Sequence, residues 1–394
     1  MPFRTVFFWF HLITGVTASA IVLVMSATGV LLTYEKQVIG WAESSPRAAP
    51  PSPTAPRLPI DALLQSAQKL RQRVTPTTVT ISRDPDAPVV LALGRDAGVL
   101  LMNAYTGEVI GNGSPARGFF RTVTDWHRWL GRSGDARATG RAVTGAANLA
   151  FLCMVLSGMY IWLPRLWTCR QVRGLMWFRR GIPAKAREFN WHHVFGFWAA
   201  VPLVIVVTSG VVMSYPWANV LVYRVAGEAP PAGPAGPTAG QARAAAGGLE
   251  RAEAKPMSLG GLNRIWARAE SVDGWRTLAL RVPSARDRQV IVTVDRGTGG
   301  QPQQRAQLTL DRATGAIIAW EPFQSLSTGR RLRSILRFAH TGEVLGLVGQ
   351  TIAGVASFGA VMLVYTGLAL SLRRLAAWRR RRTLDSQPRA SNAA

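Results

Sequence analysis

Four long apolar runs divide the chain, at about residues 6–34, 141–163, 191–215 and 344–372. A helix needs about 20 residues to cross the roughly 30 Å hydrocarbon core of a bilayer, and each run is long enough. The first run is too long for the apolar part of a signal peptide, and no small-residue cleavage site follows it closely. The pattern therefore predicts an α-helical membrane protein with four transmembrane helices.

Two clusters of basic residues predict the orientation of these helices. The first lies between the second and third runs and the second follows the fourth: Arg165, Arg170, Arg173, Arg179, Arg180, Lys185 and Arg187, then Arg373, Arg374, Arg379, Arg380, Arg381 and Arg382. Short basic segments beside membrane helices stay in the cytoplasm. We therefore expect both termini in the cytoplasm and both long connections on the opposite side.

The two long connections share one order of patterns. In each, a helical stretch (59–74 and 259–270) precedes alternating apolar and polar runs that are typical of strands. The runs are TTVTIS, PVVLALG and GVLLMNA, ending in the turn YTGEVIG, and then TLALRV, RQVIVTVD and AQLTLD, ending in ATGAIIA. A low-complexity Gly/Pro linker, GEAPPAGPAGPTAGQARAAAGG, precedes the second set and is expected to lack structure. Each connection thus predicts a small α+β module.

The apolar runs repeat in sequence. FWFHLITG aligns with FNWHHVFG at an offset of 181, the separation of His11 and His192, and Gly15 then matches Gly196. The second and fourth runs align at an offset of 209, and their matched glycines are Gly140 with Gly349, Gly145 with Gly354, and Gly158 with Gly367. The pattern predicts two parallel repeats related by a pseudo-twofold axis along the membrane normal.

The expected organisation follows from these patterns. Its parts are a first transmembrane helix (6–34), a first module (35–120), an outer helix with the second transmembrane helix (121–165), a basic cytoplasmic loop (166–188), a third transmembrane helix (189–215), a linker with the second module (216–330), a fourth transmembrane helix (331–373) and a basic cytoplasmic tail (374–394).

Composition agrees with a membrane protein and excludes other classes. The chain is 48% hydrophobic and 17% charged, with a net charge of +25. A basic chain can bind nucleic acid, but here the arginines cluster beside apolar runs and not on a folded polar face, so no nucleic-acid partner is expected. Two cysteines, Cys153 and Cys169, are too few for a disulfide framework or a zinc site.

Five histidines are the main candidates for chemistry. His11, His192 and His193 lie near the cytoplasmic starts of the first and third helices, and His127 and His340 lie just before the second and fourth. A pseudo-twofold axis would place His11 opposite His192 at one membrane face, and His127 opposite His340 at the other. Two neutral imidazoles that meet across a helical bundle form the axial ligand set of haem iron. Isolated histidines at helix ends, in contrast, serve as interfacial or capping groups.

Neighbouring residues extend the haem hypothesis. Glycines follow three of the histidines by four residues, where a missing side chain would leave space for a flat macrocycle: Gly15, Gly131 and Gly196. Close helix packing is the alternative role for glycines in membrane helices. No CxxCH motif occurs, which favours b-type haem. Arg128 and Arg337 are candidates to bind haem propionates. His193 has no counterpart in the first repeat and is a spare ligand to the His192 position.

These motifs resemble a known family. HLITG with TGVLLTY, WHRWLG with LSGMYIWLPR, WHHVFG with TSGVVMSY, and RFAHTGEVLG with YTGLAL are similar to the PepSY-associated transmembrane family, particularly its iron-regulated siderophore reductases of the bacterial inner membrane. The resemblance covers nearly the whole chain and implies two periplasmic PepSY-like modules. It also implies two b-type haems, held by His11, His127, His192 and His340, that pass electrons to a periplasmic ferric siderophore and release Fe(II).

The expected partners follow from this resemblance and from the chemistry of iron. Siderophores bind Fe(III) through hard oxygen donors, which hold the larger Fe(II) ion poorly, so reduction releases the metal. We expect the siderophore near the outer arginines: Arg121, Arg128, Arg330, Arg331 and Arg337. No GxGxxG motif is present, so the electron donor is a membrane quinol or a cytoplasmic reductase. The basic inner loop is a candidate surface for an acidic protein or for lipid head groups.

Two other functions stay open. A non-redox sensor or protease-regulating protein would be colourless and insensitive to changes of the histidines. A permease for an iron chelate would need a polar path, whereas the predicted helices contain almost no acidic residue apart from Glu343 at an edge. A redox carrier for some other periplasmic acceptor is also compatible with the sequence.

Overall fold

The computed structural model describes residues 3–45, 47–52, 54–70, 76–94, 98–162, 168–231 and 259–385. Most of the predicted low-complexity linker (residues 227–248) lies outside this part of the chain, within residues 232–258. Residues 163–167, which include Arg165 and the start of the basic loop, and residues 386–394 of the basic tail also lie outside it.

Within the described residues, four long helices are apolar and long enough to cross a membrane, which agrees with the predicted number. They are α1 (Phe3–Leu32), α5 (Ala136–Trp162), α7 (Ala184–Ser214) and α12 (Gly346–Asp385). In the most apolar 18-residue stretch of each helix, between 17% and 39% of the residues are buried inside the protein. Most of their apolar surface therefore faces outwards, as contact with lipid requires. α12 is longer than predicted, because it continues as a helix through the arginines at 373–382.

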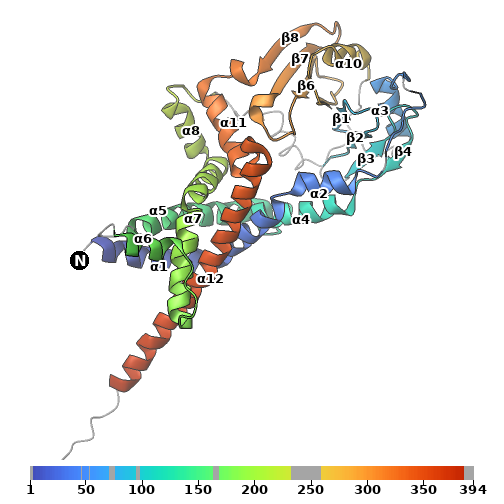
Figure 1. Ribbon diagram of the computed structural model, residues 1–394. Helices are drawn as coiled ribbons and strands as arrows, with labels where there is room; N and C mark the ends of the chain where they lie inside the picture. The colour runs from blue at the N-terminus through green and yellow to red at the C-terminus, as the bar shows by residue number, and fades with distance from the viewer. Residues whose placement is uncertain are drawn as a thin grey trace, which may run out of the picture.

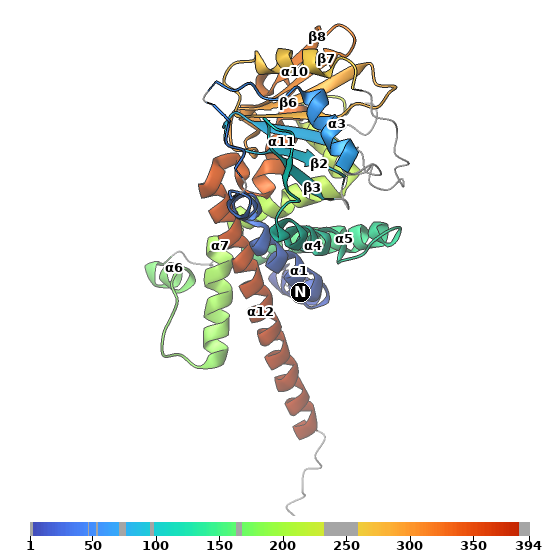
Figure 2. The same ribbon diagram turned by 90° about the vertical axis from the view of Figure 1, so that its right-hand side faces the viewer.

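The long helices pack around a small apolar core. α7 contacts α12 and α5, and α1 contacts the same two helices. Val22, Phe151, Leu203 and Val364 from the four helices meet at the centre. In both Figure 1 and Figure 2, α1 and α5 lie across α7 and α12 instead of running beside them.

One antiparallel sheet of eight strands contains strands from both long connections. In the order β4-β3-β2-β1-β5-β6-β7-β8, the strands are β1 (Thr78–Ser82), β2 (Val89–Ala92), β3 (Val99–Met102), β4 (Val109–Gly111), β5 (Thr277–Arg281), β6 (Gln289–Asp295), β7 (Arg305–Asp311) and β8 (Ile317–Pro322). The segments YTGEVIG and ATGAIIA, expected as terminal turns, each contain part of a fourth strand. Pairing of β1 with β5, with Thr80 opposite Ala279, joins the two sets.

The sheet thus differs from the two separate modules expected from sequence. Each set of four strands, taken alone, would leave an edge strand at β1 or β5, and an exposed edge invites uncontrolled pairing. Joining the two edges removes both. The helices α3 (Ile60–Leu70) and α10 (Leu262–Glu270) contact each other and share a core with the sheet through Leu63, Leu64 and Ile265.

Shorter helices connect the sheet to the long helices. They are α2 (Glu35–Ala42), α4 (Pro115–Trp129), α8 (Pro216–Val225) and α11 (Thr328–His340), with 3-10 turns at Pro302–Gln304, Phe323–Ser325 and Glu343–Leu345. A further short helix, α6 (Cys169–Met176), lies between α5 and α7 in the chain and packs on α7. α4 packs on α1 and α5, whereas α11 packs on α7 and α8. Figure 1 shows the sheet on one side of the long helices, with the start of α1 and the end of α12 pointing away from it. We call these the sheet side and the far side.

Candidate functional site

Two pairs of histidines face each other across the helices. On the far side, His11 of α1 and His192 of α7 have ring centres 6.4 Å apart, with ring planes at 88°. On the sheet side, His127 of α4 and His340 of α11 have ring centres 6.3 Å apart, with planes at 63°. The structure therefore brings together the same pairs that the sequence repeat suggested. We call them the far-side pair and the sheet-side pair.

The spacing within each pair fits one metal atom between two imidazoles. A metal–nitrogen bond of about 2.0 Å, plus roughly 1 Å from the nitrogen to the ring centre, places the two ring centres about 6 Å apart. Within the described ranges, no group of three or more His, Cys, Asp or Glu side chains could hold a metal ion. Each pair thus offers two protein ligands, the number that haem iron accepts above and below its macrocycle.

A hydroxyl from a neighbouring helix holds Nδ1 of every paired histidine. The contacts are His11 with Ser157 at 3.0 Å, His192 with Thr366 at 2.9 Å, His127 with Thr28 at 2.9 Å, and His340 with Ser209 at 3.2 Å. No hydrogen bond to Nε2 of these histidines is formed among the described residues. Nε2 of each ring is therefore the nitrogen that a metal would bind.

The hydroxyl contacts also determine the tautomer. Each hydroxyl donates its own hydrogen to a carbonyl one turn back in its helix: Ser157 to Met154, Thr366 to Met362, Thr28 to Val24, and Ser209 to Val206. A hydroxyl has one hydrogen, so it accepts the hydrogen bond from Nδ1–H of the histidine. His340 Nδ1 also lies 2.8 Å from the carbonyl oxygen of Val206, which can only accept. With Nδ1 protonated, Nε2 carries the lone pair that binds metal.

These four hydroxyl residues are not among those predicted from sequence, although the sequence contains a signal for them. Thr28 and Ser209 are related by the offset of 181, and Ser157 and Thr366 by the offset of 209. Each one directly precedes a glycine in its membrane helix. Serine and threonine are common in membrane helices, so their repetition at the two offsets, and not their presence, is the informative feature.

Two glycines leave space beside the far-side pair, but they are not the glycines that were predicted from sequence. A Cβ atom at Gly158 would lie 3.1 Å from Cε1 of His11, and one at Gly367 would lie 3.4 Å from Cε1 of His192. These glycines directly follow the hydroxyl residues, so each Ser/Thr-Gly dipeptide both binds the imidazole and makes room for it.

The glycines that follow the histidines have other surroundings. A Cβ atom at Gly15 would meet Met154 at 3.4 Å, and one at Gly196 would meet Leu363 at 3.7 Å, so both pack on a neighbouring helix. The expectation that Gly131 shares a helix face with His127 is wrong, because α4 ends at Trp129. Gly131 has a φ of +71° in the turn after the helix, where glycine avoids the steric cost of a side chain.

His193 lies beside the far-side pair, with its ring centre 6.4 Å from that of His192, but its ring has another partner. Its Nδ1 donates to the carbonyl oxygen of Phe189 at 2.8 Å, and its ring lies 4.2 Å from that of Phe189. The structure places His192, and not His193, opposite His11.

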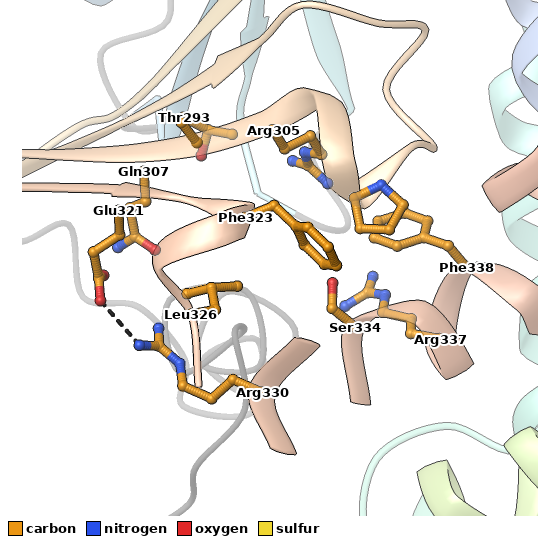
Figure 3. Close-up of a pocket in the computed structure, with 12 residues that line it drawn as sticks. Thr293, Arg305, Gln307, Glu321, Phe323, Leu326, Arg330, Ser334, Arg337 and Phe338 are labelled. Atoms are coloured by element: carbon orange, nitrogen blue, oxygen red, sulfur yellow. Dashed lines mark hydrogen bonds and ion pairs between the residues drawn. The ribbon is translucent and has the colours of Figure 1, made fainter. Parts of the chain in front are cut away.

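The arginines suggested for propionates lie on the sheet side. The guanidinium of Arg128 lies over the ring of Trp129 at 4.7 Å. Arg337 lines a cavity of about 90 Å³ between α11 and the sheet, together with Arg305 and Arg330 (Figure 3). Arg330 forms an ion pair with Glu321 at 2.9 Å. Burial, together with nearby Arg305, lowers the pKa of Arg337.

The surroundings of the sheet-side histidines favour the neutral imidazole. Burial, and then the nearby His340, lower the pKa of His127 to about 4. Burial also lowers the pKa of His340. Removal from water disfavours the charged imidazolium, and the neutral imidazole is the form that binds metal.

Fold and site together define a class of protein. The chain is a helical membrane protein that carries two partly buried histidine pairs, one towards each end of its long helices, and a single eight-stranded sheet on one side of them. It belongs to the PepSY-associated TM family, which it matches over residues 8–374. No curated protein matches the chain.

Proposed function

We propose that the protein is a dihaem reductase of the bacterial inner membrane, which passes electrons across the membrane to a periplasmic ferric siderophore and releases Fe(II). The observation that carries this proposal is the presence of two imidazole pairs, each at the spacing of one metal atom, at opposite ends of the membrane helices. Bound haem would supply an iron that changes reversibly between Fe(III) and Fe(II).

The separation of the two pairs along α1 supports transfer across a bilayer. His11 and Thr28, which contacts His127, are 17 residues apart on α1, or about 25 Å at 1.5 Å per residue. This length is close to the roughly 30 Å hydrocarbon thickness. The apolar core around Phe151 and Leu203 lies between the pairs and keeps water from the path.

We also propose that the chain is a duplicated unit with a pseudo-twofold axis. His11 with Ser157 and His192 with Thr366 are equivalent contacts under the offsets of 181 and 209. His127 with Thr28 and His340 with Ser209 are also corresponding contacts within the first and second halves. Thr28 and Ser209 obey the offset of 181, whereas His127 and His340 are 213 residues apart. In this arrangement the sheet consists of two PepSY-like modules joined at β1 and β5.

The orientation follows from the position of the basic residues. The arginines at 373–382 extend α12 on the far side, and α1 begins on that side too (Figure 1). The positive-inside rule then assigns the far side to the cytoplasm and the sheet to the periplasm. The siderophore would be reduced beside the sheet-side pair, near Arg337 and the arginines of its cavity, while membrane lipid surrounds the helices.

The experiment that tests this function is spectroscopic. Protein purified from haem-replete cells should contain two b-type haems per chain by pyridine haemochrome, and dithionite should reduce both. After excess dithionite is removed, a ferric hydroxamate should oxidise both haems and yield about two Fe(II) per chain on a ferrous-specific chelator. Colourless protein would instead indicate a sensor or protease-regulating role. If the haems stay reduced after the ferric chelate is added, the protein has a different electron acceptor.

Removing a hydroxyl should shift the potential of one haem without releasing it. In Ser157→Ala and Thr366→Val, Nδ1–H loses its acceptor, so the imidazole becomes a weaker donor and Fe(III) is less stabilised than Fe(II). A tenfold differential loss corresponds to about 60 mV for one electron, so we expect the far-side potential to rise by about that amount. Spectroelectrochemistry measures both potentials.

The matched control leaves that hydrogen bond intact. Thr17→Val removes a hydroxyl that contacts only carbonyl oxygens of its own helix, those of Ile13 and Thr14. Neither potential should change in this variant. Equal shifts in Ser157→Ala and Thr17→Val would contradict the assignment of Nδ1–H to the hydroxyl.

A further inference from the structure

A second cavity lies beside the far-side pair, between α6 and the start of α7. It encloses about 800 Å³, within the usual range for sites that bind small organic molecules. Its walls are mainly apolar and aromatic and include Trp162, Leu175, Ile182, Phe189 and Leu370. Because Trp162, Phe189 and Leu370 come from α5, α7 and α12, three membrane-spanning helices contribute to it.

The cavity is close to the proposed electron path. His193 lines it, and the ring of His193 lies 6.4 Å from the ring of His192. His192 in turn lies opposite His11. A molecule in contact with His193 is therefore separated from the far-side pair by a single side chain.

Two polar groups in the walls are complementary. Nδ1 of His193 donates to the carbonyl oxygen of Phe189, so Nε2 of this neutral ring is a hydrogen-bond acceptor. The indole Nε1 of Trp162 is buried and has no hydrogen-bond partner among the described residues. Buried donors normally have partners, so this N–H is suited to a ligand oxygen. The walls thus offer one neutral acceptor and one neutral donor, and the cationic side chains of Arg179 and Lys185 also line the cavity.

Another polar side chain holds the wall itself. The side chain of Asn190 accepts from the backbone N–H of Arg179 and donates to the carbonyl oxygens of Gly174 and Trp177. It fastens α6 and the following turn to α7. The amide is saturated by these contacts, so it shapes the cavity and leaves recognition to His193 and Trp162.

We propose that this cavity binds the ring of a membrane hydroquinone, which is the electron donor; this inference rests on the proposed function. A flat ring suits the aromatic walls, and an apolar tail fits along the membrane helices. One hydroxyl of the ring donates to Nε2 of His193, and the oxygen of the other hydroxyl accepts from Nε1–H of Trp162. Oxidation breaks two O–H bonds, forms two C=O bonds and releases two protons and two electrons. The two electrons reduce two ferric chelates to Fe(II), and the protons pass to water on the far side.

The test measures binding and electron donation on full-length protein in nanodiscs. Ala186 lines the cavity on α7, and Ala186→Trp fills it, whereas Val201→Trp adds the same group to a position on α7 that is 66% exposed. We expect Ala186→Trp to weaken binding of radiolabelled decylubiquinone at least tenfold and Val201→Trp to leave it unchanged. His193→Leu should also weaken binding at least tenfold, while all three variants keep the wild-type haem content.

Electron donation gives a second readout. Decylubiquinol should reduce the haems at least tenfold more slowly in Ala186→Trp and His193→Leu, with reduction by dithionite unchanged. Wild-type affinity in both variants, or binding of flavin mononucleotide or inorganic phosphate in place of decylubiquinone, would overturn the proposal. If dithionite-reduced protein releases Fe(II) but decylubiquinone does not bind, this site fails and the proposed function stands. If decylubiquinone binds but no Fe(II) is released, the proposed function fails instead.

Discussion

Replacing His127 or His340 with alanine should remove one haem of two and leave the other in place. Each variant deletes one axial ligand of the sheet-side pair, whereas the far-side pair, with its own hydroxyl partners Ser157 and Thr366, is unchanged. His11→Ala and His192→Ala should do the reverse. The haem content measured by pyridine haemochrome should fall from about two per chain to about one in all four variants. In low-temperature EPR spectra, the two sheet-side variants should lose one low-spin signal and the two far-side variants the other.

His193→Ala is the matched control for this series. His193 is next to His192 on α7 and has an equally large ring, but it contacts Phe189 and not His11. It should retain two haems and both signals. Retention of two haems in His192→Ala together with loss of one in His193→Ala would reverse the assignment. Circular dichroism and size-exclusion profiles equal to wild type establish that the variants fold.

A single methyl group at Gly140 or Gly349 should disrupt the sheet-side haem selectively. A Cβ atom at Gly140 would overlap the carbonyl oxygen of Trp129, where α4 ends, and one at Gly349 would overlap the carbonyl oxygen of Gly342, just after α11. Backbone cannot move aside as a flexible side chain can. We expect each alanine variant to lower the free energy of unfolding by about 3 kcal/mol, the upper end for overpacking. Because α4 and α11 carry His127 and His340, the sheet-side pair loses its spacing.

Gly118→Ala tests whether this effect depends on the close approach. Gly118 lies in α4, and a Cβ atom there would meet nothing within 4 Å. Alanine at that position should stabilise the protein by about 0.5–1 kcal/mol, because glycine is unfavourable inside a helix. Thermal unfolding, followed by haem absorbance and by circular dichroism, separates loss of the site from loss of the fold. Similar behaviour of Gly118→Ala and Gly140→Ala would show that close backbone contact is not the cause.

The structure also gives a physical reason for the aligned glycines. Gly140 and Gly349 permit contact between the start of a membrane helix and the end of the helix before it, whereas Gly158 and Gly367 leave room for an imidazole. From sequence, glycines in these segments had two alternative roles, which were close packing of helices and leaving space beside a histidine ligand. Both occur, at different glycines, and only the neighbouring atoms distinguish them.

The sequence by itself determined the four membrane helices, most of the strands and the pairing of the histidines. Apolar length and alternation are local properties, and the repeat offsets relate distant segments without coordinates. Only the tertiary structure decided three other features. It joined two sets of strands into one sheet, it placed His192, and not His193, opposite His11, and it placed four hydroxyls on the histidine rings. Each of these features depends on contacts between helices or strands that are distant in sequence. Turning a helix by one residue position changes which side chain faces the neighbouring helix.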